Sequence, residues 1–382
     1  MAVFFSIFFT LYSIINYYIF IRGWQAIAGI TFLKPFYVFT FLLFALGYLA
    51  AKFFHSFLPP LVYDLLLWVG SFWFAFILYL TLFILLIDIT RVLNFYFGIF
   101  PAFINSNYEQ SKQITAAVVL FLSSTIILIG FINSTNFIVK NLSINIDKKN
   151  SNLSQLNIVM VSDIHLSPLN GESFLKQIIE KVNQLNPDIV LIPGDIVDDK
   201  PHILSERGIG KSLKQLNSQY GVYACTGNHE YINGGEESVR YLSSNGIKVM
   251  RDSFEVVQNS FILVGREDVS KQNFTQRSRK SLSEIMNGST KDLPVILLDH
   301  TPYKLNEARD NKIDIQLSGH THNGQMFPIN LITNLIYELS RGYLKKGNTH
   351  YYVSSGVGSW GPRVKIASDA EIVNIKVTFR DF

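Results

Sequence analysis

The sequence predicts two structural units: an N-terminal transmembrane α-helical bundle of four spans and a C-terminal α/β domain. Three observations support this prediction. In the 382-residue chain, charged residues are scarce before about residue 131, four stretches there are long and apolar, and short apolar runs farther on repeatedly end in polar residues. A composition change of this kind indicates separate units. We therefore expect a helical domain at 1–135, a tether at 136–155 and an α/β domain at 156–382.

Four apolar stretches in the first unit are long enough to cross a bilayer, because about 20 helical residues match a hydrocarbon core of about 30 Å. Very apolar core helices are the alternative, but residues 65–87 contain no charged side chain, which is rare in soluble helices. The first stretch lacks a basic start and a small-residue cleavage site, so we expect it to remain as an anchor. The predicted spans are 3–21, 35–51, 61–89 and 114–133.

The membrane orientation is predicted from the basic residues that flank the spans. Four spans place both termini on the same side, and the Lys and Arg residues near the spans divide evenly between the two sides. The lysines that follow the last span lie farther from it and count less. The distribution therefore leans toward an extracytoplasmic C-terminal domain in an integral protein of the plasma (inner) membrane.

Charge and cysteine content exclude several classes of protein. The formal net charge is +4, with 33 basic and 29 acidic residues and no basic cluster, so we expect no nucleic-acid partner. The single cysteine, Cys225, excludes an intrachain disulfide and a paired-cysteine zinc site. The sequence makes no prediction of the oligomeric state.

Apolar runs of strand length in the C-terminal unit end in residues that can bind metal ions. Runs at 156–161 and 189–192 flank a predicted helix at about 172–185, which is typical of a strand, helix, strand unit. Further runs lie at 221–224, 295–298 and 313–317. Ligands bind at the carboxyl ends of strands in such sheets. The polar residues that follow these five runs include Asp163, His165, Asp195, Asn228, His229, His300, His320 and His322.

These residue types fit two adjacent divalent cations. Such a site needs imidazole nitrogens, carboxylate and amide oxygens, and one carboxylate that can bridge the two ions. A single histidine in this sequence would more often be structural, but five motifs at corresponding strand ends are hard to explain by chance. Manganese, iron and zinc all suit such mixed ligands, so the metal identity stays open.

At this point the sequence closely resembles the calcineurin-like metallophosphoesterase family. The matching blocks occur in order, and the resemblance extends over about 156–375. It implies a four-layer α/β/β/α sandwich in which two central sheets carry the site at one edge. The blocks are Asp163-Ile164-His165, Gly194-Asp195, Gly227-Asn228-His229-Glu230, His300 and Gly319-His320-Thr321-His322.

The resemblance also implies roles for the residues of these blocks. Asp163, His165 and His322 would hold one metal ion, and Asn228, His300 and His320 would hold the other. Asp195 would bridge the two ions. His229 would lie beside them as the catalytic residue that stabilises or protonates the leaving oxygen. Two cations about 3.5–4 Å apart would clamp the phosphate oxygens and lower the pKa of a shared water.

The expected substrate is a membrane lipid or a lipid-linked phosphoester. Protein phosphatases of this superfamily typically carry Gly-Asp-x-x-Asp-Arg-Gly, in which the arginine binds phosphate. In this chain the last three positions of the motif are Asp198, Asp199 and Lys200, so the arginine is absent. This difference argues against a phosphoprotein substrate. The segments at 298–302, 318–328 and 354–360 resemble a membrane-associated subset of the family. That subset acts on phospholipid-type diesters and, in some members, on the pyrophosphate of UDP-diacylglucosamine.

Two alternatives remain open from the sequence. The helices could merely anchor a general phosphodiesterase, or the chain could be a membrane sensor or scaffold that retains an inactive phosphoesterase fold. The second alternative predicts a missing ligand, and none is missing.

Overall fold

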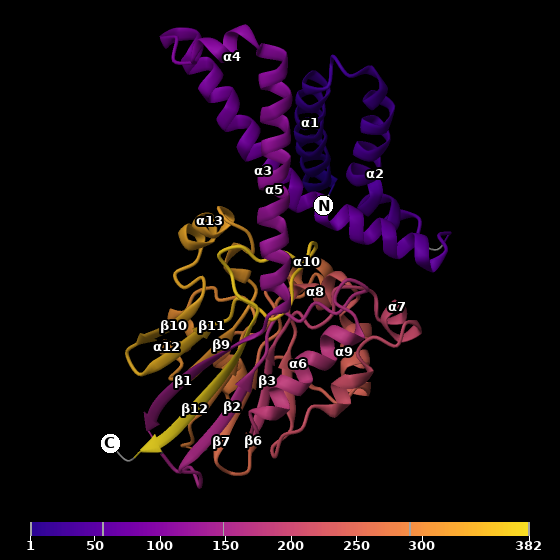
Figure 1. Cartoon of the computed structure of the whole chain (residues 1–382). Helices are drawn as coiled ribbons and strands as arrows, with labels where there is room; N and C mark the ends of the chain where they lie inside the picture. Colours follow the sequence, from indigo (N-terminus) through magenta and orange to yellow (C-terminus); the bar gives the residue numbers. More distant parts are fainter. Residues whose placement is uncertain (1, 56, 148, 290–291, 381–382) are drawn as a thin grey trace. The chain divides into compact units, whose positions relative to one another are not determined.

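The computed structural model describes residues 2–55, 57–147, 149–289 and 292–380. The chain forms two compact units, which are described separately. One comprises Met1–Phe131 with Gly361–Val364, and the other comprises Ile132–Trp360 with Lys365–Phe382. Figure 1 shows the first unit as helices and the second as strands with surrounding helices.

The described residues of the helical unit form four long α-helices, one short α-helix, α4 (Ala102–Ser106), and one short 3-10 helix, η1 (Thr31–Leu33). Three helical stretches in the described part of the chain are long and apolar enough to cross a membrane: Thr31–Phe53, Pro60–Phe97 and Tyr108–Thr135. They correspond to the second, third and fourth expected spans. The expected span at 3–21 is helical, but its role as a span stays a prediction. The long helices are α1 (Ala2–Ala26), α2 (Lys34–Phe53), α3 (Pro60–Phe97) and α5 (Tyr108–Thr135).

The helix α3 is longer than the sequence predicts. It extends over 38 residues and ends where Gly98 adopts a left-handed backbone with φ of 60°. Asp88, expected at the end of a span, therefore lies within the helix. Its carboxylate lies 2.6 Å from the guanidinium of Arg22 and accepts a hydrogen bond from the Tyr18 hydroxyl. Pairing lowers the cost of placing a charged side chain in an apolar helical unit.

The second unit is built on two six-stranded mixed sheets. The first sheet has the order β1-β12-β2-β3-β4-β5, and the second has the order β10-β11-β9-β8-β7-β6. Strands β2 to β5 run parallel, as do β7, β8, β9 and β11. The strands are β1 (Ile138–Asp147), β2 (Gln155–Met160), β3 (Ile189–Pro193), β4 (Val222–Cys225), β5 (Lys248–Met250), β6 (Ser253–Val257), β7 (Phe261–Gly265), β8 (Val295–Leu298), β9 (Ile315–Ser318), β10 (Gly342–Lys346), β11 (Thr349–Val353) and β12 (Glu371–Arg380).

Three apolar clusters form the core of this unit. One joins α6 and α9 to the first sheet, the second joins the two sheets, and the third joins α11 and α12 to the second sheet. In Figure 1, α6 and α9 lie against the sheet that contains β2 and β3. The helices are α6 (Glu172–Gln184), α7 (Pro201–Glu206), α8 (Asn228–Ile232), α9 (Gly235–Ser244), α10 (Lys271–Thr275), α11 (Leu282–Met286), α12 (Asn306–Asp310) and α13 (Ile329–Ile336), with short 3-10 helices η2 (Lys211–Gln215) and η3 (His322–Gly324).

The segment expected to be a tether contains a strand. β1 pairs in parallel with β12 along its whole length, from Ile138 opposite Glu371 to Asp147 opposite Arg380. Only two residues separate the end of α5 from the start of β1. The expected tether at 136–155 therefore contains an ordered part of the first sheet, although the division into three domains stays a prediction.

Candidate metal centre

The predicted site residues follow strands of both sheets. Asp163 and His165 follow β2, Asp195 follows β3, and Asn228 follows β4. The second sheet contributes His300 after β8, and His320 and His322 after β9. The imidazole Nδ1 of His300 lies 2.7 Å from the carbonyl oxygen of Pro193, at the end of β3. This contact brings the two sets of loops to one place.

The backbone at several of these residues is left-handed. φ is 55° at Asp163, 52° at His165 and Asp195, 71° at His320, and 47° at His322. Residues other than glycine rarely adopt this conformation, and its cost of about 1–3 kcal/mol is tolerated mainly at functional sites. The surrounding loops therefore hold these side chains in place at an energetic cost, which supports a role beyond folding.

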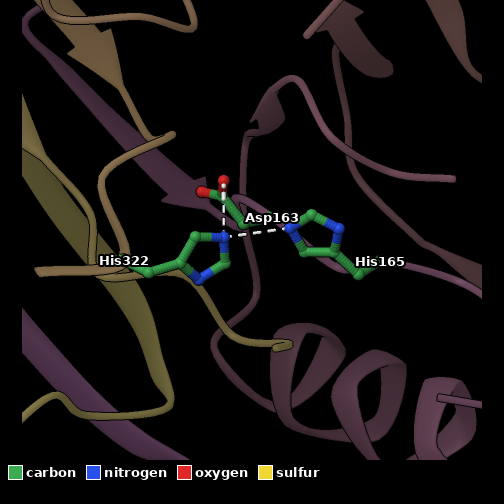
Figure 2. A group of neighbouring side chains, drawn as sticks. All are labelled: Asp163, His165 and His322. Atoms are coloured by element: carbon green, nitrogen blue, oxygen red, sulfur yellow. Dashed lines mark hydrogen bonds and ion pairs between the residues drawn. The ribbon is translucent and has the colours of Figure 1, made fainter. Parts of the chain in front are cut away.

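One group of three side chains comes from the loops after β2 and β9. Figure 2 shows Asp163, His165 and His322 pointing toward one another. The two imidazole Nε2 atoms are 2.9 Å apart, and the Nε2 of His322 lies 3.4 Å from Oδ1 of Asp163. All three side chains are buried, and one ligand atom from each lies within 4.8 Å of the others.

A second group lies around the carboxamide oxygen of Asn228. This oxygen is 3.2 Å from Nε2 of His300 and 2.8 Å from Nδ1 of His320. Because one oxygen and two imidazole nitrogens converge, these three side chains can offer ligands to a single cation.

Asp195 lies between the two groups. Its Oδ2 is 3.2 Å from Nε2 of His300, and 3.9 Å from Nε2 of His165. Burial alone would raise the pKa of this carboxyl, but the imidazoles of His300 and His229 outweigh it and hold the pKa well below its ordinary value. Asp195 is therefore an ionised carboxylate that faces both groups.

The chemistry of the site fits divalent metal ions. Oδ2 of Asp163 is buried and has no hydrogen-bond partner among the described residues, which is costly for a carboxylate oxygen without a cation nearby. A Cβ atom at Gly319 would collide with this oxygen, and a Cβ at Gly227 would collide with Oδ1 of Asp195. Glycine at these positions lets the backbone approach the two carboxylates closely.

His229 lies beside these groups and pairs with Asp198. Its Nδ1 is 2.5 Å from Oδ1 of Asp198, and its Nε2 is 4.0 Å from Oδ2 of Asp195. Burial alone would lower the pKa of His229, but Asp195 and Asp198 raise it from 6.5 to about 9. Although burial alone would raise the pKa of Asp198, His229 and His165 hold it well below its ordinary value. His229 is therefore protonated near neutral pH.

Sequence reasoning missed the roles of Asp198 and Glu230. Asp198 lies three residues after Asp195, and Glu230 directly follows His229 in the block Gly227-Asn228-His229-Glu230. The Glu230 carboxylate is buried and accepts hydrogen bonds from the backbone N–H groups of Gly227, Asp195, Ile196 and Val197. It thereby ties the loop after β3 to the loop after β4.

The segment 266–268, which follows β7, contacts residues next to the candidate metal ligands. Asp268 is buried and accepts a hydrogen bond of 2.6 Å from the Thr301 hydroxyl, next to His300. The neighbouring Arg266 is 4% exposed and pairs with Asp299 and Glu307. These side chains are used in internal contacts.

Comparison with known proteins identifies the family. The model for calcineurin-like phosphoesterases matches residues 156–324. A metallophosphoesterase of Aquifex aeolicus, named uncharacterized, is 30% identical over 226 residues, which cover 59% of this chain and 85% of that protein. The chain belongs to the calcineurin-like metallophosphoesterase family. The resemblance stated from the sequence is thus confirmed.

Two relatives within the metallophosphoesterases bear on the membrane and the substrate. A Danio rerio protein named transmembrane protein with metallophosphoesterase domain is 35% identical over 248 residues, which cover 62% of this chain and 56% of that protein. The UDP-2,3-diacylglucosamine pyrophosphatase LpxG of Chlamydia trachomatis is 26% identical over 288 residues, covering 61% of this chain and 87% of that protein. The chain spans less than two thirds of the Danio rerio relative and of a Helicobacter pylori metallophosphoesterase.

Proposed function

We propose that the chain is an integral-membrane phosphoesterase that uses two divalent metal ions to hydrolyse a phosphodiester or pyrophosphate bond in a lipid or lipid-linked nucleotide. The observation that carries the proposal is the position of Asp195. Its ionised carboxylate faces His165 in one group of ligands and His300 in the other. A carboxylate in that position can bridge two cations.

The residues divide into two sets of ligands in this proposal. Asp163, His165 and His322 would hold one ion, and Asn228, His300 and His320 would hold the other, with Asp195 available to both. Manganese, iron and zinc all suit these ligands. When bound, the ions neutralise the charge on the phosphate and supply a hydroxide nucleophile near neutral pH. The loops hold the ligands in a four-layer α/β/β/α arrangement of the two sheets and their helices.

His229 supplies the proton in this mechanism. Its Nε2 points toward the shared carboxylate of Asp195, while Asp198 holds its Nδ1. Because Asp195 and Asp198 raise its pKa to about 9, the imidazolium persists at neutral pH and can donate a proton to the leaving oxygen. Asp198 fixes the ring orientation and thereby leaves Nε2 available for that transfer.

The candidate membrane spans support the choice of a lipid substrate. Three helices are long and apolar enough to span a bilayer, and the expected first span would make four. A relative that acts on UDP-2,3-diacylglucosamine matches 61% of the chain. We propose residence in the plasma (inner) membrane with the catalytic domain on the extracytoplasmic side. A nucleotide-linked substrate would instead require the catalytic domain on the cytoplasmic side. The substrate, once identified, therefore tests the proposed orientation.

The test is hydrolysis by the full chain purified in detergent, with manganese or with chelator. The panel contains a phosphomonoester, a simple phosphodiester, phospholipids and UDP-diacylglucosamine. We expect metal-dependent cleavage of a lipid substrate by the native chain and by Asp310→Asn, a control at an exposed carboxylate, but not by Asp195→Asn. Cleavage of only the simple diester would favour a merely anchored phosphodiesterase, and no cleavage would favour an inactive sensor or scaffold.

A further inference from the structure

Helix α13 exposes four of its five apolar side chains on the outside of the catalytic unit. Leu335 is 87% exposed and Ile336 is 63% exposed, and Leu331 and Ile332 are also exposed. On the same helix, Asn330 and Thr333 are half-buried. Soluble proteins normally turn the apolar face of a helix inward. The reversed arrangement of α13 therefore requires an apolar occupant that covers its outer face.

This apolar face adjoins the candidate metal centre. α13 begins seven residues after His322, and Gly324 of η3 approaches the backbone of Asn330 so closely that a Cβ would not fit between them. Just beyond the other end of α13, the ring of Tyr337 lies 6.1 Å from the ring of His320. Whatever covers α13 consequently lies next to a loop that carries two of the proposed metal ligands.

α13 also lies at the end of the unit where the chain arrives from α5. Asn133, in the last turn of α5, donates a hydrogen bond to the carbonyl oxygen of Lys365. The next residue, Ile366, accepts a hydrogen bond from the backbone N–H of Phe327, just before α13. Phe327 is itself exposed. The consecutive residues Lys365 and Ile366 thus connect, through these two hydrogen bonds, the end of α5 to the residue that precedes α13.

We propose that the face formed by Phe327, Leu331, Ile332, Leu335 and Ile336 inserts into the bilayer that holds the helical unit. The α13 sequence contains no charged residue that would have to enter the interface. Helices with a strongly apolar face lie in the plane of the interface with that face among the acyl chains. Insertion would bring the metal centre to the level of lipid head groups. The inference rests on the membrane anchorage in the proposed function, but not on its substrate.

The test places an environment-sensitive fluorophore on an introduced cysteine at Leu335 in the full chain, reconstituted in nanodiscs with or without nitroxide-labelled phospholipid. The native Cys225 is fully buried, so mild labelling modifies the introduced thiol, and the unsubstituted chain gives the background. The matched control is Arg380→Cys, at the exposed end of β12. In the pairing of β1 with β12, Arg380 lies opposite Asp147, which is at the end of β1 that is farther along the chain from α5.

We expect nitroxide lipid to quench the probe at Leu335 about threefold more than the probe at Arg380. Equal quenching at both positions would overturn the proposal. A blue-shifted probe at Leu335 that lipid does not quench would also overturn it, because protein would then cover the face. A probe at Leu331 repeats the test if Leu335→Cys folds poorly. Hydrolysis of a soluble diester by each labelled chain reports the metal centre separately, so failure of insertion and failure of the proposed chemistry are distinguishable.

Discussion

Asp198 holds His229 through a contact of 2.5 Å between Oδ1 and Nδ1, which leaves Nε2 of the imidazole directed toward Asp195. The pair is built from the loop after β3 and the start of α8, which follows β4. The Asp198 carboxylate both favours the protonated form of His229 and orients its imidazole ring. A proton donor needs both properties.

Replacement of Asp198 by Asn should move the pH dependence of hydrolysis. In the native chain, the rate should fall as the pH rises through about 9, where His229 loses its proton. Asp198 contributes to the raised pKa, so its loss should shift this fall to lower pH. We also expect a rate about 10–100-fold lower at neutral pH, because the ring loses its orienting partner. The check is a pH–rate profile on a soluble diester, with Asp310→Asn as control. An unchanged alkaline limb would contradict the assignment of His229 as the acid.

Replacement of Glu230 by Gln should destabilise the catalytic unit and impair the site. The amide presents one oxygen where the carboxylate accepts four backbone N–H groups. We expect a loss of about 2–3 kcal/mol in the free energy of unfolding, since hydrogen bonds to a buried charge are strong. The melting temperature and the metal affinity should both fall. Glu237→Gln, at an exposed position, is the matched control. A native melting temperature in Glu230→Gln would argue against this role.

Replacement of Lys365 by Met should loosen the loop that covers Asp163. Lys365 is fully buried and donates hydrogen bonds to the carbonyl oxygens of Ser355, Gly356 and Asp369. Burial lowers its pKa to about 8. Three unpaired carbonyls should cost about 2–4 kcal/mol, measured as a lower melting temperature. Lys376→Met, at an exposed position of β12, should melt like the native chain. Equal melting of the two variants would show that the loop does not depend on Lys365.

Local patterns predicted the elements that carry the site. The run at 295–298 is the strand β8 with those bounds, and the helix expected at about 172–185 is α6. Buried parallel strands appear as continuous apolar runs, and the loops at their carboxyl ends have to meet. The strand pattern placed Asp163, His165 and His322 at strand ends, whereas their grouping around one metal ion came from the family resemblance, because β2 and β9 belong to different sheets.

Long-range pairing was much harder to predict. β1 pairs with β12, more than 200 residues later, and its alternating polar residues gave no indication of the partner. The partnership of Asp198 with His229 depends on the same kind of information, because two loops from different strands have to adopt matching conformations. The outward apolar face of α13 was missed because its apolar spacing resembles that of any core helix.

The central claim is that two metal ions share Asp195, and it is tested most directly by the metal content of the purified full chain. Elemental analysis after reconstitution with manganese, zinc or iron should find two ions per native chain and per Asp310→Asn control. Asp195→Asn should retain one ion or none and hydrolyse the soluble diester at least about 100-fold more slowly. Two retained ions with an unchanged rate in Asp195→Asn would contradict the account.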